Sequence, residues 1–294
     1  MSHEPSSSPH IARPEAEPTA PRDAASAWVL VMGGKGVRER TDWIVIEEPL
    51  EIRARGPGQE PISVAVTMRT PGDDPELAVG FLYTEGLVLS RGEVVAAQEC
   101  ASKRAGGACN TVQVVLSRPF DSSALKRNFF ATSSCGVCGK ATLDQVAVRC
   151  PPVGSGPVVG RSILVGLPDV LRGAQAVFDR TGGLHAAGLF DAEGRLIALR
   201  EDVGRHNAVD KLVGRALLEG DVPLTGRILL VSGRTSFEIL QKAAVAGVPI
   251  VCAVSAPSSL AVSMADRLGI TLVGFLRGTS FNVYTHPERI DPHR

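Results

Sequence analysis

Residues 227–275, RILLVSGRTSFEILQKAAVAGVPIVCAVSAPSSLAVSMADRLGITLVGF, decide the fold class of this chain. Two segments have the apolar spacing of amphipathic helices, 237–246 and 260–268. Apolar runs typical of buried strands lie before, between and after them, at 227–231, 249–254 and 270–275. Strands that alternate with helices in this order predict parallel pairing with right-handed crossovers. The stretch therefore predicts an α/β domain.

The rest of the chain is predicted to form a second domain and a tail. From about residue 128 the α/β pattern continues, with helices at 167–178 and 205–219 and a hairpin of 184–190 with 195–200. Upstream, one helix at 74–86 is surrounded by short β-rich runs, at 43–46, 62–68 and 111–116. We predict a disordered tail at 1–26, a small N-terminal α+β domain at 27–118 and an α/β domain at 119–294, which makes the chain α+β overall.

The composition excludes several classes of protein. With 294 residues, of which 44% are hydrophobic, the chain can bury the core of one large domain or two ordinary ones. Lys plus Arg equals Asp plus Glu at 31 each, so we predict no general nucleic-acid or membrane surface. The tail lacks the pattern of a signal peptide, and the apolar run at 27–32 is too short to span a bilayer. We therefore expect a soluble, cytoplasmic protein.

The stretch 133–140, SSCGVCGK, places the thiols of Cys135 and Cys138 two residues apart, just before a predicted helix. Ser133 or Ser134 can cap that helix, so at least one cysteine lies near free backbone N–H groups and the positive end of the helix dipole. A thiol in such a place tends toward thiolate, which is the reactive form. In the cytoplasm this spacing indicates a catalytic, redox or metal-binding role rather than a disulfide framework.

The other cysteines offer one alternative. Cys100 and Cys109 can complete a four-thiolate zinc site with Cys135 and Cys138, although the spacing of the first two fits such a site poorly. Cys252 lies inside an apolar strand and is predicted to be a buried, inert thiol. We predict that the protein holds no metal.

Polar loops follow the three predicted parallel strands: 232–236 (SGRTS), 255–259 (SAPSS) and 277–280 (RGTS). The carboxyl ends of parallel strands share one edge of the sheet, beside helix N-termini. Arg234 and Arg277 offer planar forks for phosphate oxygens, while hydroxyl and backbone N–H groups offer neutral donors. The edge therefore predicts a site for a phosphorylated ligand. The alternative is that the Ser and Thr side chains only cap their helices.

Two cations, Arg205 and His206, begin another predicted helix, for which Asp202 is a candidate cap. Cations at a helix N-terminus oppose the macrodipole, which favours a bound anion or an acidic partner there. Ion pairing with Glu201, Asp202 or Asp210 is the alternative explanation.

Two further motifs are weak. Gly33 to Gly36 resembles a phosphate loop but lacks the Walker spacing, so a hairpin turn is predicted instead. His185-Ala186-Ala187 beside a Cys-x-x-Cys is similar to the zinc deaminase motif, but Ala187 stands where the catalytic glutamate is required, and the cysteines come first. A deaminase reaction is therefore disfavoured, although a related fold is not. His185 by itself is more typical of a core histidine than of a ligand.

Taken together, the motifs resemble the formate dehydrogenase accessory sulfurtransferases, the FdhD/NarQ family. The matching segments, which span about 40–290, are EEPL (47–50), TMRTPG (67–72), AVGFL (78–82), SCGVCG (134–139), TGGLH (181–185), EDVGRHNAVDK (201–211), SGR (232–234) and YTHP (284–287).

The resemblance implies a small N-terminal domain followed by a cytidine-deaminase-like three-layer α/β domain. It also implies transfer of persulfide sulfur from a cysteine desulfurase to the molybdenum cofactor, in its bis-(molybdopterin guanine dinucleotide) form, before insertion into formate dehydrogenase. Cys135 would carry the persulfide, Cys138 would assist, and a homodimer is expected. The expected cofactor-binding residues, for which GDP is a mimic, are Phe275, Leu276, Arg277, Gly278, Thr279, Ser280, Ser232, Gly233, Arg234, His185, Arg205 and His206.

Overall fold

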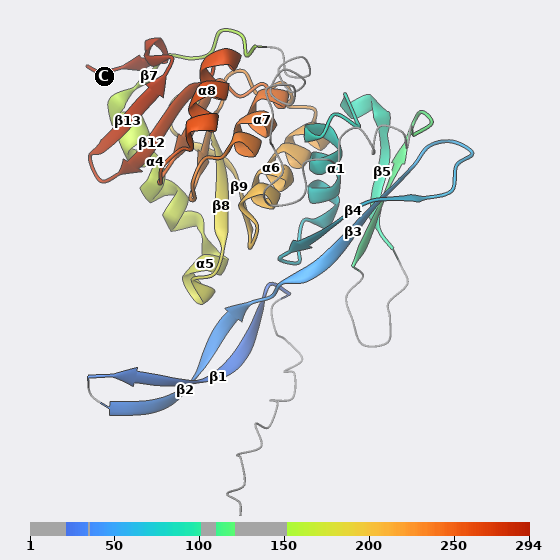
Figure 1. Cartoon of the computed structure of the whole chain (residues 1–294), viewed down its shortest axis with the longest axis horizontal. Coiled ribbons are helices and arrows are strands. Elements are labelled where there is room, and N and C mark those ends of the chain that lie inside the picture. Colours follow the sequence, from blue (N-terminus) through green and yellow to red (C-terminus); the bar gives the residue numbers. More distant parts are fainter. Residues whose placement is uncertain (1–21, 35, 101–109, 121–151) are drawn as a thin grey trace, which may run out of the picture.

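The computed structural model describes residues 22–34, 36–100, 110–120 and 152–294. Its larger sheet has six strands in the order β13-β12-β11-β10-β8-β9 (Figure 1). In chain order these are β8 (His185–Phe190), β9 (Leu196–Asp202), β10 (Ile228–Val231), β11 (Ile250–Ala253), β12 (Thr271–Arg277) and β13 (Ser280–Thr285). The predicted parallel pairing is confirmed for β10 with β11 and for β11 with β12. Strand β8 pairs antiparallel with both β10 and β9.

Helices cover both faces of this sheet. Alternate side chains along its strands therefore belong to two different apolar cores. In β10, Leu229 and Val231 belong to a core with α6 (Arg205–Glu219), α7 (Phe237–Val245) and α8 (Ser259–Leu268). Ile228 and Leu230 belong to a second core with α4 (Arg161–Ala174). This arrangement is the mixed α/β class that the sequence predicts. It is completed by the short elements α5 (Ala176–Thr181), β7 (Val159–Gly160), β14 (Ile290–Asp291) and a 3-10 turn (Pro287–Arg289).

A smaller four-stranded sheet stands beside the first, in the order β4-β3-β6-β5. Its strands are β3 (Glu48–Arg55), β4 (Ile62–Arg69), β5 (Val94–Glu99) and β6 (Thr111–Leu116), with a 3-10 turn at Arg91–Glu93 and the helix α1 (Asp74–Thr84). The strands 62–68 and 111–116 and the helix at 74–86 are confirmed, whereas β3 and β5 were not predicted.

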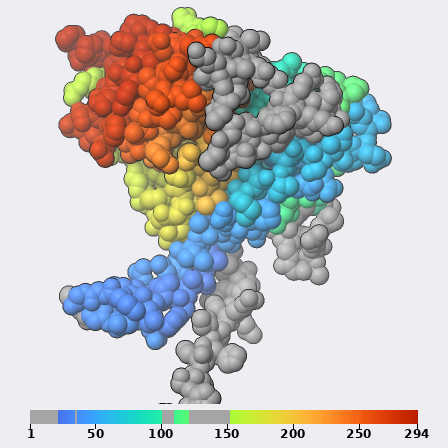
Figure 2. Space-filling model, in the orientation of Figure 1, coloured from blue at the N-terminus to red at the C-terminus, as the bar shows by residue number. Residues whose placement is uncertain are grey.

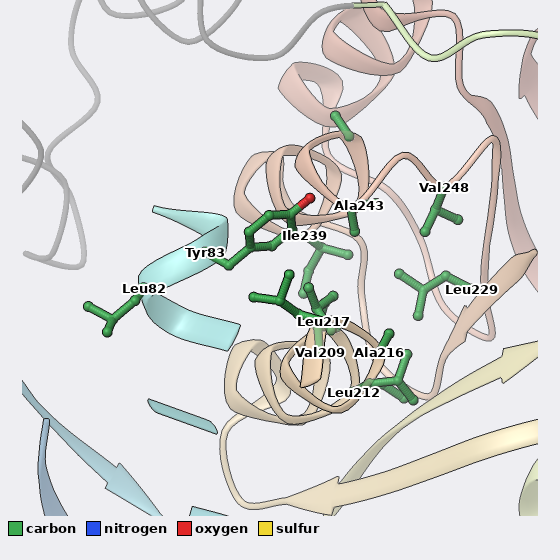
Figure 3. Packing of buried hydrophobic residues seen from close by; sticks show 14 of the residues in the cluster. Leu82, Tyr83, Val209, Leu212, Ala216, Leu217, Leu229, Ile239, Ala243 and Val248 are labelled. Atoms are coloured by element: carbon green, nitrogen blue, oxygen red, sulfur yellow. The ribbon is translucent and has the colours of Figure 1, made fainter. Parts of the chain in front are cut away.

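Helix α1 joins the two sheets, because it packs directly on α6. Figure 3 shows Tyr83 of α1 close to Ile239 of α7, with Val209 and Leu217 of α6 beside them. One continuous apolar cluster therefore includes side chains from both sheets and from helices α1, α6, α7 and α8. The division into domains at residue 118 remains a prediction.

A two-stranded hairpin projects away from this body (Figure 1). Its strands are β1 (Ala24–Gly33) and β2 (Gly36–Val45), and the pairing of Gly33 with Gly36 confirms the turn predicted there. Strand β1 begins inside the stretch assigned to the tail, and the predicted strand at 43–46 is the end of the longer β2.

One predicted helix was wrong in its bounds. The helix expected at 167–178 begins at Arg161, ends at Ala174 and is followed, after Gln175, by the separate α5. Pro168 lies inside α4, where its missing N–H removes one helical hydrogen bond. In the part of the chain that the structure describes, no helix has the length and apolar character needed to span a membrane.

Candidate functional site

The carboxyl ends of β10, β11 and β12 meet at one edge of the larger sheet, as predicted. The loops that follow them are hydrogen-bonded to each other. The Thr235 N–H donates to the Ala256 carbonyl at 3.3 Å, and the Ser258 N–H donates to the Thr235 carbonyl at 3.0 Å. The Phe275 N–H donates to the Ser255 carbonyl at 3.2 Å. These bonds hold the three loops together as one layer above the sheet.

The first residue of β8 lies at this same edge, because β8 runs antiparallel to β10. Ser232 fixes the junction: its N–H donates to the Ala186 carbonyl at 2.9 Å, and its hydroxyl accepts from the Ala186 N–H at 2.9 Å. A Cβ on Gly233 would lie 3.3 Å from Nδ1 of His185 and 3.8 Å from Cδ of Arg205. The backbone of the 232–236 loop therefore lies close to His185 and Arg205, and a larger residue at 233 would press on the His185 ring.

The motif at 201–211 divides into structural and free residues. Asp202 is fully buried, and its Oδ2 lies 2.8 Å from Nζ of the buried Lys211. The same carboxylate accepts from the Thr70 N–H at 3.2 Å, and Lys211 donates to the Thr70 carbonyl at 2.9 Å. The prediction that Asp202 caps α6 was wrong. Gly204 is the N-cap residue, and its N–H donates to Oδ1 of Asp202 at 2.8 Å.

The other acidic candidates for pairing with Arg205 and His206 have different partners. Asp210 contacts Lys242 at 3.0 Å, and Glu201 accepts the Val177 and Phe178 N–H groups at the start of α5, at 3.1 and 2.9 Å. The predicted alternative, in which these neighbours neutralise the two cations, is therefore wrong for the pairs that the structure describes.

The two cations at the start of α6 have different surroundings. His206 Nε2 lies 3.1 Å from the Ser236 hydroxyl and 2.9 Å from Oε2 of Glu238. The Nε atom of Arg205 is buried and has no hydrogen-bond partner among the described residues. The Thr235 hydroxyl, in a side chain that is 1% exposed, likewise has no partner in the described part of the chain. Buried polar atoms are rarely left without a partner, so both are candidates to bind a ligand.

The positive charge at this edge affects His185. Burial lowers the pKa of His185, and the neighbouring charges of Arg205 and His206 lower it further, whereas Asp202 opposes them. The hydrogen bond from His206 lowers the pKa of Glu238. His185 is therefore neutral near pH 7 and can accept or donate a hydrogen bond, while Arg205 supplies the permanent charge.

The segment 275–280 forms the tight connection between β12 and β13, where Arg277 pairs with Ser280. Phe275 has a φ of 53°, which is rare for a residue other than glycine, and Gly278 has a φ of 56°. The Arg277 guanidinium lies 5.6 Å from the centre of the Phe275 ring. Arg277, Thr279 and Ser280 are exposed at the end of the sheet, as is Arg234 in its own loop. That Arg234 and Arg277 bind one ligand stays a prediction.

The cysteines are only partly covered by the structure. Cys135, Cys138 and Cys109 lie outside the described residues. Cys252 is fully buried, and burial raises the pKa of its thiol to about 12, so the prediction of an inert core thiol is confirmed. Within the described ranges, no three His, Cys, Asp or Glu side chains are grouped closely enough to bind a metal ion.

Two residues of the site were missed from the sequence. Thr235 stands inside the quoted 232–236 loop, but a buried hydroxyl cannot be distinguished there from a helix-capping one. Glu238 lies in the first turn of α7, where an acidic residue is ordinary, and its contact with His206 crosses 32 positions of the chain.

Fold and site together define an α/β protein in which strand ends and helix N-termini meet at one edge of a sheet, where two buried polar groups have no partner among the described residues.

A family model described as the FdhD/NarQ family matches residues 45–291, and the chain belongs to this family. Relatives named sulfur carrier protein FdhD come from Streptomyces avermitilis (54% identical, covering 86% of this chain and 91% of the relative) and Mycobacterium tuberculosis (51%, 85% and 92%). A third, from Thermoplasma volcanium, is 45% identical and covers 87% and 91%.

A solved structure shares the fold. It is described as a formate dehydrogenase accessory protein from Desulfotalea psychrophila, with a TM-score of 0.71 at 24% identity. The match covers 92% of this chain and the whole of that one.

Proposed function

We propose that this chain is a sulfur carrier that takes persulfide sulfur from a cysteine desulfurase and transfers it to the molybdenum cofactor of formate dehydrogenase. The observation that carries the proposal is its 45–54% identity, over most of its length, to relatives named as sulfur carriers. We expect the transfer to take place in the cytoplasm, between a homodimer of this chain and each of the two enzymes in turn.

In the proposed loading step the Cys135 thiolate attacks the outer sulfur of the donor's cysteine persulfide. A new sulfur–sulfur bond forms on Cys135, the donor's sulfur–sulfur bond breaks, and the donor leaves as a thiolate, so the step needs no oxidant or reductant. Cys138, with two residues between it and Cys135, assists release of the sulfur. The chemistry needs an accessible, low-pKa thiol, which Cys252 is not.

The sheet edge is proposed to bind the acceptor, bis-(molybdopterin guanine dinucleotide) molybdenum cofactor, as a substrate. Each guanine dinucleotide contains a pyrophosphate, whose oxygens accept charge-assisted hydrogen bonds. The Nε of Arg205 and the hydroxyl of Thr235, which have no partner among the described residues, supply donors. Burial lowers the pKa of His185, the charges of Arg205 and His206 lower it further, and these same charges attract an anion. Phe275 to Ser280, with Ser232 to Arg234, His185 and His206, complete the proposed cofactor-binding set.

The sulfur-loading step is tested by incubating the protein with a desulfurase and cysteine, followed by intact-mass measurement under non-reducing conditions. We expect the wild type and Cys252→Ala to gain the mass of one sulfur atom and Cys135→Ser to gain none. Cys138→Ser is expected to load but to transfer poorly. Loading of Cys135→Ser equal to the wild type would contradict the assignment of the persulfide.

The same samples distinguish the two alternatives. A thiol–disulfide oxidoreductase would form a reversible Cys135–Cys138 disulfide and take up no sulfur. A zinc-stabilised binding module would contain one zinc per chain by elemental analysis, lost in Cys135→Ser. We expect neither result for the purified, reduced protein.

The cofactor site is tested with GDP by calorimetry on the full chain. Arg205→Ala should weaken binding roughly tenfold or more, because it removes a charged donor to phosphate. Arg53→Ala is the control, since Arg53 is a half-exposed arginine of the other sheet and pairs with Glu51 at 2.7 Å. Equal GDP affinity in wild type and Arg205→Ala would exclude Arg205 from the cofactor site.

A further inference from the structure

The end of strand β4 is hydrogen-bonded to the segment that begins α6. Thr70, the residue after β4, is 2% exposed and uses all three of its polar groups in this way. Its N–H donates to Oδ2 of Asp202 at 3.2 Å, its hydroxyl accepts from the Val203 N–H at 3.2 Å, and its carbonyl accepts from Nζ of Lys211 at 2.9 Å. Thr70 therefore connects the smaller sheet to the residues between β9 and α6.

Asn207, in the first turn of α6, makes a second set of contacts with the same strand. Its Nδ2 donates to the Met68 carbonyl at 2.7 Å and to Oδ1 of Asp202 at 3.0 Å. The Thr67 hydroxyl donates to Oδ1 of Asn207 at 3.3 Å. The start of α6 is thus held by β4 at two points, at Val203 before the helix and at Asn207 inside it.

Arg205 and His206 lie between these two points. The N-cap residue that precedes them, Gly204, is closely enclosed: an added Cβ would lie 2.9 Å from Nδ2 of Asn207 and 3.3 Å from Oδ1 of Asp202. The backbone that carries both cations therefore has little freedom while the bonds to β4 are intact.

His185 is the neighbour that senses the position of Arg205. It pairs with Asp202 across β8 and β9, so its backbone is fixed to the same part of the sheet. Burial lowers the pKa of His185, and the charge of Arg205 lowers it further. A displacement of Arg205 would therefore change the pKa of His185 even when no ligand is bound.

The two sheets would be joined without these polar contacts. Helix α1 packs on α6, and one apolar cluster extends across the junction. In Figure 2 the blue and cyan surface of the smaller sheet adjoins the yellow and orange surface of the larger sheet and its helices. Buried hydrogen bonds add little net stability, because their groups give up bonds to water, but a satisfied network selects one geometry. The bonds from β4 are better explained by the position that they impose on the start of α6.

We propose that the end of β4 positions Arg205 for anion binding, with Thr70 acting through the Val203 N–H and Thr67 acting through Asn207. Both threonines are positioning residues, which act on the ligand only through Arg205. The inference rests on the proposed cofactor site, since it assigns a role to residues that hold this site. It gives the TMRTPG motif at 67–72, in the smaller sheet, a function at the edge of the larger one.

The test compares two threonines whose hydroxyls both bond within the junction. Thr70→Val keeps the size of the side chain but removes the acceptor of the Val203 N–H. Thr84→Val is the matched control: Thr84 is 1% exposed, and its hydroxyl donates to Oδ1 of Asp210 at 2.7 Å, more than one helical turn from Arg205. Each variant loses a buried hydrogen bond, so both should lower the midpoint of urea unfolding.

GDP affinity, measured by calorimetry on the full chain, separates a positioning role from a structural one. Thr70→Val should weaken GDP binding by roughly tenfold, because a misplaced donor contributes less to binding. Thr70→Ser, which retains the hydroxyl, and Thr84→Val should both bind GDP as the wild type does. Equal affinity in wild type and Thr70→Val, or an equal loss in Thr84→Val, would overturn the proposal.

The pKa of His185, measured by NMR titration, follows Arg205 in the absence of ligand. The His185 signal is identified by its absence in His185→Gln. We expect a higher pKa in Thr70→Val than in the wild type, because the charge of Arg205 moves away, and an unchanged pKa in Thr70→Ser and Thr84→Val. An unchanged pKa in Thr70→Val would contradict the proposal.

Failure of the cofactor site and failure of the positioning role give different results. If the wild type does not bind GDP, the cofactor site is wrong, while the His185 titration still decides whether β4 positions Arg205. Should Thr70→Val fail to fold, Thr67→Val replaces it in both measurements and should change them in the same direction. The absence of any change in Thr67→Val would then overturn the proposal.

Discussion

Gly80 of α1 and Gly214 of α6 lie back to back at the junction of the two sheets. A Cβ on Gly80 would come within 2.9 Å of the Gly214 nitrogen, and a Cβ on Gly214 within 2.7 Å of the Gly80 nitrogen. The two helix backbones are thus in direct contact, and only glycine allows this approach.

We therefore expect Gly80→Ala and Gly214→Ala each to lower the free energy of unfolding by about 1–3 kcal/mol or more, because the helices must separate. Urea unfolding at equilibrium measures the effect. Gly166→Ala in α4 is the matched control: its Cβ meets no atom within 4 Å, so it should be neutral or stabilise by about 0.4–1 kcal/mol. Destabilisation by all three variants alike would contradict the close helix contact.

A buried ion pair links the same helices to α7. Lys242 Nζ lies 3.0 Å from Oδ2 of Asp210 and 3.0 Å from the Thr84 hydroxyl, and burial alone would lower its pKa, but Asp210 and Glu85 raise it. Lys242→Met should cost about 3–5 kcal/mol, because it leaves the Asp210 carboxylate buried without its partner. The double variant with Asp210→Asn should recover part of this loss.

The control for that prediction is a surface pair of the same kind. Arg215 and Glu219 are one helical turn apart at 2.9 Å, and both reach solvent. Exposed pairs of this sort contribute only about 0.2–1 kcal/mol, so Arg215→Met should cost far less than Lys242→Met. Equal losses in urea unfolding would show that the Lys242–Asp210 pair is not held as the structure describes.

His185 should make the fold sensitive to acid. Its pKa is lower in the folded state than the value of about 6.5 in the unfolded chain. Between these two pKa values the folded state binds fewer protons than the unfolded state, so the free energy of unfolding decreases as the pH falls. His185→Gln should therefore lose less stability than the wild type between pH 7 and pH 5, in urea unfolding at each pH.

His286 provides a comparison of opposite sign. Its hydrogen bond to the Asp266 carbonyl raises its pKa, so its contribution is present below about pH 6.5 and is lost as the pH rises through the raised value. His286→Gln should accordingly lose more stability than the wild type on acidification. If both variants changed the acid-induced loss of stability in the same direction, the environments assigned to His185 and His286 would be wrong.

Arg277 at the end of β12 tests the cofactor segment. We expect Arg277→Ala to weaken GDP binding by about 1.5–3 kcal/mol, roughly ten- to more than a hundredfold, because a charge-assisted phosphate contact is lost. It should still accept sulfur normally, since loading takes place on Cys135, yet fail to activate formate dehydrogenase. Calorimetry with GDP and a persulfide assay on the same variant measure both effects. Unchanged GDP affinity would show that this strand end is not part of the cofactor site.

Local patterns in the sequence were sufficient for the larger sheet. The alternation of apolar runs and amphipathic segments from 227 to 275 predicts β10, α7, β11, α8 and β12 within a few residues, because each depends on neighbours in the chain. The same is true of the turn between Gly33 and Gly36 and of the three strand-end loops. Strands β3 and β5 were missed. In β3 the signal was present, because the buried Leu50, Ile52 and Ala54 alternate with charged residues as in a half-buried strand, whereas β5 has no such alternation.

The motif at 201–211 shows what the sequence left undecided. Its charged residues look equivalent along the chain, yet Asp202 and Lys211 are bound to Thr70, and Asp210 to Thr84 and Lys242. These partners lie 32 to 141 positions away, so no local pattern reveals them.

By itself, therefore, the sequence determined the family and the parallel α/β core, since motif spacing and apolar periodicity are properties of short segments. The reactive thiol pair at Cys135 and Cys138 stays a prediction of the sequence. Only the tertiary structure decided that the buried Nε of Arg205 has no partner in the described part of the chain, that Gly80 and Gly214 bring two helices into backbone contact, and that one side of the hairpin leaves both tryptophans exposed. Each of these depends on which distant groups have already satisfied one another, and burial and hydrogen bonding are settled only when the whole chain has packed.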